Sequence, residues 1–174
     1  AALVRLDGVQ VKPAAIVGEV GQGAGLLQRV VDRATIALTA EMLGAMSVAF
    51  EMTLDYLKTR QQFGKVIGSF QALKHRAARL FIELELARSL VMAAHESVHA
   101  GKSEPEIARL ASMAKARLSD AFVLVANEAV QMHGGIGMTD EHDIGFYLKR
   151  ARVAAATFGD AAYHRGRFAG LSGF

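Results

Sequence analysis

The stretch LLQRVVDRATIALTAEMLGAMSVAFEMTLDYL, residues 26–57, decides the fold. Its apolar residues recur every three or four positions, from Leu26 through Ile36 and Phe50 to Leu57, as on one face of a helix. No proline interrupts the stretch, so we expect one helix from about residue 25 to residue 59. A helix of this length is stabilised by packing its apolar face against neighbouring helices.

Further helical segments follow with the same periodicity. The second is expected over about 66–100, and the third begins after an N-cap at Ser103, where Glu106 is placed for a capping box. Two shorter helices are expected over 144–157 and 161–171. Long helices joined by short connections predict an all-α fold: an up-down four-helix bundle plus a short C-terminal helix.

The first segment has a different pattern. Residues 1–23 alternate apolar and polar side chains and then contain several breakers, at Pro13, Gly18, Gly21 and Gly23. We expect a β-strand followed by a loop, and a lone strand needs a sheet to join. We therefore interpret residues 1–23 as the end of an upstream β-domain with its linker, and residues 24–174 as the helical domain.

Composition limits the classes of protein. The chain has 174 residues, 52% of them hydrophobic, with two prolines and no tryptophan, which favours one helical globular domain. No apolar run reaches the roughly 18 residues of a membrane span, so none is expected. The absence of cysteine excludes disulfides and thiolate chemistry, and a cytoplasmic location fits best.

Two local patterns are weaker signals. HESVH, residues 95–99, matches the zinc-protease motif, but it lies at a helix end without a third ligand, so we expect no metal site. The basic C-terminal part has few interleaved aromatic residues and no nucleic-acid-binding signature, so we expect a solvated helix face and no nucleic-acid partner. Its basic residues are Lys149, Arg150, Arg152, Arg165 and Arg167.

Two connections between helices carry chemistry only when they are taken together. RQQFGKVIGSFQALKH, residues 60–75, offers the donors of Arg60 for phosphate and the flat ring of Phe63. QMHGGIG, residues 131–137, lacks side chains at three glycines, which allows a ligand to approach the backbone. Either stretch alone is more typical of an ordinary helix connection or C-cap.

In this order the two stretches resemble the signature segments of the acyl-CoA dehydrogenase family, YLKTRQQFGKVIGSFQALKHRAA and QMHGGIGMTDEHDIGFYLKRARV in this chain. The likeness extends through nearly the whole sequence. The complete family chain has an N-terminal helical domain and a middle β-domain, so this chain resembles less than half of it. The β-strand expected before residue 24 then corresponds to the end of the middle domain.

The resemblance implies an FAD site shared between neighbouring subunits of a homo- or hetero-oligomer, a dimer of dimers. The glycines then admit the adenine-diphosphate half of the flavin. The resemblance further implies an acyl-CoA thioester as substrate and electron-transfer flavoprotein as acceptor. The cofactor-binding residues that it implies are Arg60, Gln62, Phe63, Phe70, Gln71, Gln131, Met132, His133, Gly134, Gly135 and Asp160.

The resemblance also exposes a missing catalytic group. Family members remove the α-proton of the substrate with a glutamate, while the β-hydrogen leaves as hydride to the flavin. The glutamate would stand before Gly159, where this chain has Phe158, and the alternative position on the first helix holds Ala34. The implied substrate contacts are Asp32, Arg33, Thr157, Phe158 and Gly159, and Asp32 or Glu41 is a candidate for an unusual base.

Three hypotheses follow. The first is a subunit of an acyl-CoA dehydrogenase whose partner chain supplies the base. The second is a diverged flavin monooxygenase of the same fold, which needs no α-proton base. The third is a non-enzymatic helical interaction module whose site has decayed.

Overall fold

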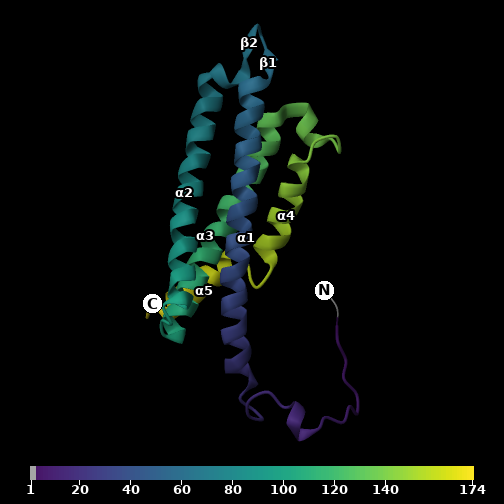
Figure 1. Cartoon of the computed structure of the whole chain (residues 1–174), viewed down its shortest axis with the longest axis vertical. Helices are drawn as coiled ribbons and strands as arrows, with labels where there is room; N and C mark the ends of the chain where they lie inside the picture. Colours follow the sequence, from purple (N-terminus) through teal and green to yellow (C-terminus); the bar gives the residue numbers. More distant parts are fainter. Residues whose placement is uncertain (1–2) are drawn as a thin grey trace.

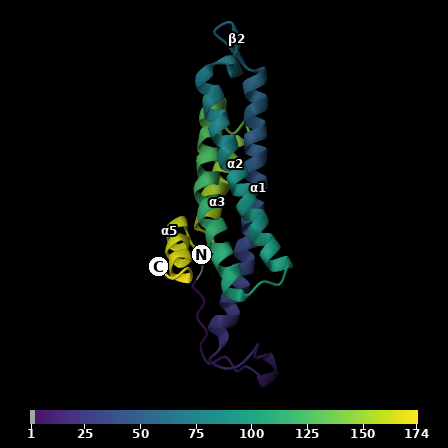
Figure 2. The ribbon, with the colours of Figure 1, turned by 90° about the vertical axis from the view of Figure 1, so that its left-hand side faces the viewer.

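The structure, a computed structural model, describes residues 3–174 and confirms the all-α fold. The helices are α1 (Gly23–Thr59), α2 (Gln71–His99), α3 (Glu104–His133), α4 (Ile144–Ala156) and α5 (Ala161–Leu171). The first four run alternately up and down the bundle, as the sequence predicts (Figure 1). The central helix is α3, which contacts all four others, and α5 lies across its side (Figure 2).

The core is formed by large apolar side chains where α1, α2 and α3 meet. Met42, Met46, Leu118 and Phe122 have no exposed surface, and Leu80 has 1%. Burying each such side chain stabilises the fold by about 1.5–3 kcal/mol. The apolar face read from the periodicity of residues 26–57 is therefore the face that packs in the bundle.

The second helix begins later than the sequence predicts, because a small hairpin comes first. Strands β1 (Gln61–Gln62) and β2 (Lys65–Val66) pair antiparallel, and a 3₁₀ helix η2 (Ile67–Ser69) leads into α2. The two turn residues have positive φ angles, +55° at Phe63 and +75° at Gly64. Such a turn matches the twist of a tight hairpin, and glycine adopts it without strain.

The start of α3 is placed correctly, but the capping box is wrong. Ser103 is the N-cap residue, yet its side chain makes no capping hydrogen bond. The Glu106 carboxylate instead lies 3.6 Å from Lys102 Nζ. An ion pair with the preceding lysine has replaced the return bond to the backbone.

The predicted strand at the start of the chain is also wrong. Among residues 3–22 the structure contains only a short 3₁₀ helix, η1 (Pro13–Ala15), and the side chains are exposed. A strand forms only with a hydrogen-bonded neighbour, and the described residues provide none for this segment, which runs away from the bundle (Figure 1).

One helix, α1, meets the length and composition criteria of a membrane span, with a mean hydropathy of 1.2 over its most apolar window. However, 44% of that window is buried inside the bundle. A core helix meets the same criteria, so this finding is weak evidence for a membrane location.

Candidate functional site

One end of the bundle gathers most of the residues predicted to bind the cofactor. There α1 and α3 end and α2 begins, so three helices, the hairpin and the 3₁₀ helix η3 (Gly134–Met138) surround a cleft of about 550 Å³. All the predicted cofactor-binding residues line this cleft except Gln71 and Asp160. The elements that surround the cleft meet at the hairpin end of the molecule (Figure 1).

The hairpin places an aromatic side chain at the rim of the cleft. Phe63 is 87% exposed, and its ring stands edge-on to that of Phe70, with the centroids 6.1 Å apart. The ammonium of Lys65 lies 4.3 Å from the centroid of the Phe70 ring. The rim therefore combines an exposed aromatic face with a positive charge.

The polar groups of the cleft are mainly hydrogen-bond donors. The Arg76 guanidinium is held by Glu128, with Nε and Oε2 2.5 Å apart. Within residues 3–174, the side chains of Arg60, Gln62 and Gln131 make no hydrogen bond, and all three are exposed. No side chain caps the first turn of α2, so its N–H groups add positive potential at this end. The arrangement suits an anionic ligand.

Two predicted cofactor contacts turn out to be buried in the protein. Met132 is 4% exposed and His133 is 2% exposed, and the His133 ring stacks on Tyr56 with centroids 4.6 Å apart. His133 Nδ1 donates to the Ala129 carbonyl at 2.7 Å, which leaves Nε2 as a buried acceptor without a partner among the described residues. Burial lowers the pKa of His133. These two residues form the floor of the cleft and offer little surface to a ligand.

The glycines after α3 have two different roles. A Cβ added at Gly134 or Gly135 would meet nothing within 4 Å, so the backbone there borders open space. A Cβ at Gly137 would lie 2.7 Å from the Val130 carbonyl oxygen, so this glycine is required for packing against α3. The sequence predicted close ligand approach for all three, and the geometry allows it at the first two.

The sequence missed several residues that line the cleft: Tyr56, Ile67, Leu73, Arg76 and Ile136. Helical spacing could have found two of them, because Tyr56 is one turn before Arg60 and Leu73 is one turn after Phe70. Ile67 lies in the irregular connection, where no periodicity predicts the direction of a side chain.

The two remaining predicted cofactor contacts lie elsewhere. Gln71 is exposed beside the cleft, and its amide donates to His75 Nε2 at 3.0 Å. Asp160 is the N-cap residue of α5, a helix that lies away from the hairpin end of the bundle (Figure 1), and its Oδ1 accepts the Tyr163 N–H at 2.8 Å. The structure therefore does not bring Asp160 together with the other predicted cofactor-binding residues.

The predicted substrate contacts Thr157, Phe158 and Gly159 form the connection between α4 and α5, which we call the 157–160 turn. Phe158 has a φ of +59°, a left-handed conformation that is strained for a non-glycine residue, and its side chain is 44% exposed. A Cβ at Gly159 would clash with the Tyr163 ring. The turn is thus closely fitted to α5.

The other two predicted substrate contacts are engaged in ion pairs. Both carboxylate oxygens of Asp32 accept from Arg167, at 2.6 and 2.9 Å, and Asp32 is 4% exposed. Arg33 makes a two-point pair with Glu104 at 2.9 and 2.8 Å. These pairs join α1 to α5 and to α3, so neither side chain is available to a substrate as the structure stands.

Both candidate bases, Asp32 and Glu41, are paired with arginines in this structure. Asp32 is closed on both oxygens by Arg167. Glu41 bonds Arg150 through both oxygens, at 2.6 and 2.8 Å, and this bonding lowers its pKa. A carboxylate whose oxygens are occupied by a guanidinium is a poor acceptor for a substrate proton.

The basic C-terminal residues are also more engaged than predicted. Arg150, Arg165 and Arg167 each pair with a carboxylate on another helix, so a simple solvated face describes only part of the group. His95 and His99 are exposed on the last turns of α2, and the described residues contain no cluster of three potential metal ligands.

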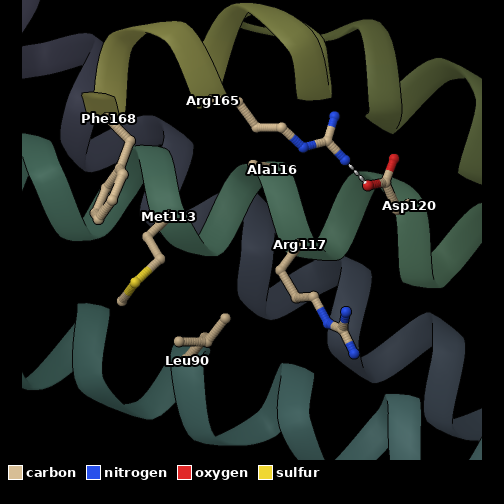
Figure 3. Close-up of a pocket in the computed structure, with 7 residues that line it drawn as sticks. All are labelled: Leu90, Met113, Ala116, Arg117, Asp120, Arg165 and Phe168. Carbon is tan, nitrogen blue, oxygen red and sulfur yellow. Dashed lines mark hydrogen bonds and ion pairs between the residues drawn. The ribbon is translucent and has the colours of Figure 1, made fainter. Parts of the chain in front are cut away.

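A second cavity, of about 340 Å³, lies between α2, α3 and α5 (Figure 3). Leu90, Met113 and Phe168 supply its apolar wall, while Arg165 bonds Asp120 at its edge. Arg117 is paired with Glu83 at 2.6 Å. None of the residues predicted for cofactor or substrate lies here.

The sequence comparison now decides the family. A profile of the acyl-CoA dehydrogenase C-terminal domain matches residues 21–170, a range that includes the cleft and the 157–160 turn. The chain belongs to the acyl-CoA dehydrogenase family. Its members are FAD-dependent flavoproteins and oxidoreductases.

Relatives within the family support the assignment along most of the chain. The acyl-CoA dehydrogenase IpdE2 of Mycolicibacterium smegmatis is 43% identical over 76% of this chain and 40% of its own length. The mitochondrial short/branched chain specific acyl-CoA dehydrogenase of Bos taurus is 33% identical over 86% of this chain and 34% of its own. An acyl-CoA dehydrogenase structure from Geobacillus kaustophilus superposes with a TM-score of 0.86 and 30% identity, covering 91% of this chain and 41% of that one.

The chain therefore spans between a third and two-fifths of the length of these relatives. Within it, the cleft has features that fit part of an FAD molecule. Arg60 offers unpaired donors for a diphosphate. The open backbone at Gly134 and Gly135 leaves room for close approach.

Proposed function

We propose that residues 24–174 are the C-terminal, FAD-binding and oligomerisation domain of an acyl-CoA dehydrogenase, which removes the α- and β-hydrogens of an acyl-CoA thioester. The cleft at the hairpin end of the bundle carries this proposal. It combines unpaired donors, an exposed aromatic ring and bare glycine backbone in one place, a combination that suits a diphosphate dinucleotide.

Different residues of the cleft suit different parts of the FAD molecule. Arg60 would donate to the diphosphate, Phe63 would offer a flat surface to a ring, and the bare backbone of Gly134 and Gly135 would allow close approach of the cofactor. When bound, FAD supplies the hydride acceptor for the β-hydrogen of the substrate. The protein contributes binding and orientation at this end of the bundle.

The α-proton requires a base that this chain lacks at the family's positions. Phe158 and Ala34 are apolar, and the nearby Asp160 is committed to capping α5. Because Asp32 and Glu41 are closed by arginines, we propose that a companion chain supplies the base in a hetero-oligomer. A chain that binds the cofactor and the substrate but lacks the base is then one subunit of a hetero-oligomeric enzyme and depends on the other subunit for activity.

The same proposal covers the assembly and the acceptor. A cleft built from one end of a bundle holds only part of FAD, so a neighbouring subunit completes it, in a dimer of dimers with this domain at the centre. In this proposal, electron-transfer flavoprotein would serve as the electron acceptor. The cytoplasmic location stays a prediction, since the bovine relative is named as mitochondrial.

The comparisons with named dehydrogenases favour neither alternative function. A flavin monooxygenase would share the cleft and differ at the 157–160 turn, and an interaction module would not retain FAD. One experiment on the reconstituted protein separates the proposal from both alternatives. Only a dehydrogenase is expected to lose its flavin absorbance when an acyl-CoA is added in the absence of oxygen.

The experiment measures FAD retention by the native assembly. The absorbance spectrum of the purified assembly, after reconstitution, is expected to show bound flavin. Replacing Arg60 with alanine is expected to weaken FAD binding by about 1.5–3 kcal/mol, or roughly tenfold to a hundredfold in Kd, because a charge-assisted bond is lost. Arg29→Ala, an exposed arginine near the other end of α1, is the matched control. A flavin-free wild type contradicts the proposal, and equal retention by both variants removes Arg60 from the site.

A further inference from the structure

A buried lysine supports the 157–160 turn from below. Lys115, on α3, has no exposed surface. Its ammonium donates to three acceptors: the carbonyl of Gly159 at 2.8 Å, the carbonyl of Ala155 at 3.0 Å and the hydroxyl of Ser119 at 3.0 Å. All three N–H groups of the ammonium are therefore used, and two of them hold the backbone around the turn.

A buried histidine holds the same turn from the side of α5. His164 is 1% exposed, and its Nε2 lies 3.0 Å from the Phe158 carbonyl oxygen. A carbonyl only accepts, so Nε2 carries the proton and donates it. Two consecutive carbonyls, those of Phe158 and Gly159, are thus fixed by two buried side chains from different helices.

These contacts are a costly way to stabilise a helix connection. Burying an ammonium disfavours its charged form, and burial lowers the pKa of Lys115 to about 8. An apolar side chain of similar volume would fill the space without that penalty. Unlike an apolar side chain, the lysine fixes the orientation of the carbonyl groups that it binds. Its hydrogen bonds thereby hold the backbone beside a strained position, the left-handed Phe158.

We propose that Lys115 and His164 are positioning residues that hold the 157–160 turn so that the side chain at position 158 faces the acyl-CoA thioester. This inference rests on the proposed function for the identity of the ligand. None of the residues that make these contacts lines the cofactor cleft.

The test compares Lys115→Met with Lys102→Met, a replacement of an exposed lysine just before α3, in the native assembly. Amide hydrogen exchange reports the order of residues 157–160, and titration with an acyl-CoA reports binding. We expect Lys115→Met to speed exchange in the turn and weaken acyl-CoA binding by about tenfold or more, because small displacements of binding groups are costly. FAD content is expected to stay at the wild-type level, and Lys102→Met to change nothing.

Two milder variants cover the case in which Lys115→Met does not fold. Lys115→Gln keeps N–H donors on a shorter, neutral side chain, and His164→Gln leaves Lys115 in place, so each is expected to give a smaller change of the same kind. Unchanged exchange at residues 157–160 in any folded variant at position 115 overturns the inference. Faster exchange with unchanged acyl-CoA affinity overturns the link to substrate. If the wild type binds no acyl-CoA at all, the proposed function fails, while the exchange measurement still tests the clamp.

Discussion

Phe158 stands where the resemblance to the family implies a glutamate. Its backbone is left-handed, its carbonyl is held by His164, and the next residue is the glycine that fits against Tyr163. The support for a functional side chain is therefore intact, while the side chain itself cannot accept a proton.

Restoring a carboxylate at this position is expected to restore part of the reaction. Loss of a general base costs about 10²- to 10⁴-fold in rate, so the chain without a companion is expected to dehydrogenate acyl-CoA very slowly. Phe158→Glu is expected to recover part of that loss, and the negative charge of Asp160 two residues away raises the pKa of the new carboxyl group.

The measurement is anaerobic bleaching of the flavin after addition of a panel of acyl-CoA thioesters. Phe158→Gln is the matched control, since it has the same shape as glutamate without the charge. Equal bleaching by both variants would show that the carboxylate is not the missing element. Rapid bleaching by the wild type alone would place the base elsewhere in this chain.

At the scale of single residues, the sequence predicted the cleft better than the substrate side. The cleft residues Arg60, Phe63 and Gln131 belong to short continuous motifs at helix ends. Residues that are neighbours in such a motif are neighbours in space as well, so the motif alone places their side chains close together. Asp32 and Lys115 are different, because their roles depend on which side chain of a distant helix faces them. No local pattern reveals that Asp32 pairs with Arg167, 135 positions away.

The helix α5 depends on polar anchors, since His164 is its only fully buried side chain among the described residues. Arg167 reaches both Asp32 and Ser112, and its side chain is 15% exposed. An ion pair of this kind adds little compared with an apolar contact, but breaking it leaves a buried charge without a partner.

Arg167→Met is therefore expected to lower the free energy of unfolding by about 3–5 kcal/mol, because Asp32 stays buried and unpaired. Arg33→Met breaks a pair of similar geometry that is 42% and 44% exposed, and it is expected to cost no more than about 1 kcal/mol. Urea unfolding of the two variants measures the difference. Equal losses would show that the burial of the Asp32 pair does not matter.

At the scale of elements, periodicity located all five helices, the two short ones included, and failed at the strands. The hairpin was missed because two-residue strands have no period to detect, and because Phe63-Gly64 is not one of the turn pairs, such as Asn-Gly, that indicate a hairpin. The strand expected before residue 24 was wrong for the opposite reason. Its alternation is present in the sequence, but a strand depends on a partner that local pattern does not supply.

The stability of the whole molecule is expected to depend on pH through two buried histidines. Burial lowers the pKa of His133 and of His164 below the ordinary value of 6.5. For His164, the neighbouring charges of Lys115 and Arg167 lower it further and that of Asp32 opposes them. The unfolded chain therefore binds protons at a pH where the folded chain does not.

The contribution of these two histidines to the free energy of unfolding is therefore constant above about pH 6.5. Below that pH the contribution falls, and it is lost as the pH drops through the pKa values of the folded protein. His133→Gln is expected to make the fall shallower, while His95→Gln, at an exposed position, is expected to leave the slope as it is. Denaturant unfolding at several pH values between 7 and 5 measures how the free energy of unfolding changes with pH. A slope that is the same in all three proteins would exclude His133 as a contributor.

The open cleft at the hairpin end has a consequence for how the protein accumulates in a cell. If FAD is held between this cleft and a neighbouring chain, cofactor binding and subunit association share one free energy, and each raises the other by mass action. Scarcity of flavin would then act as a shortage of assembled protein. The exposed Phe63 and the bare glycine backbone would be left facing water, and the unassembled chains would be the form open to degradation.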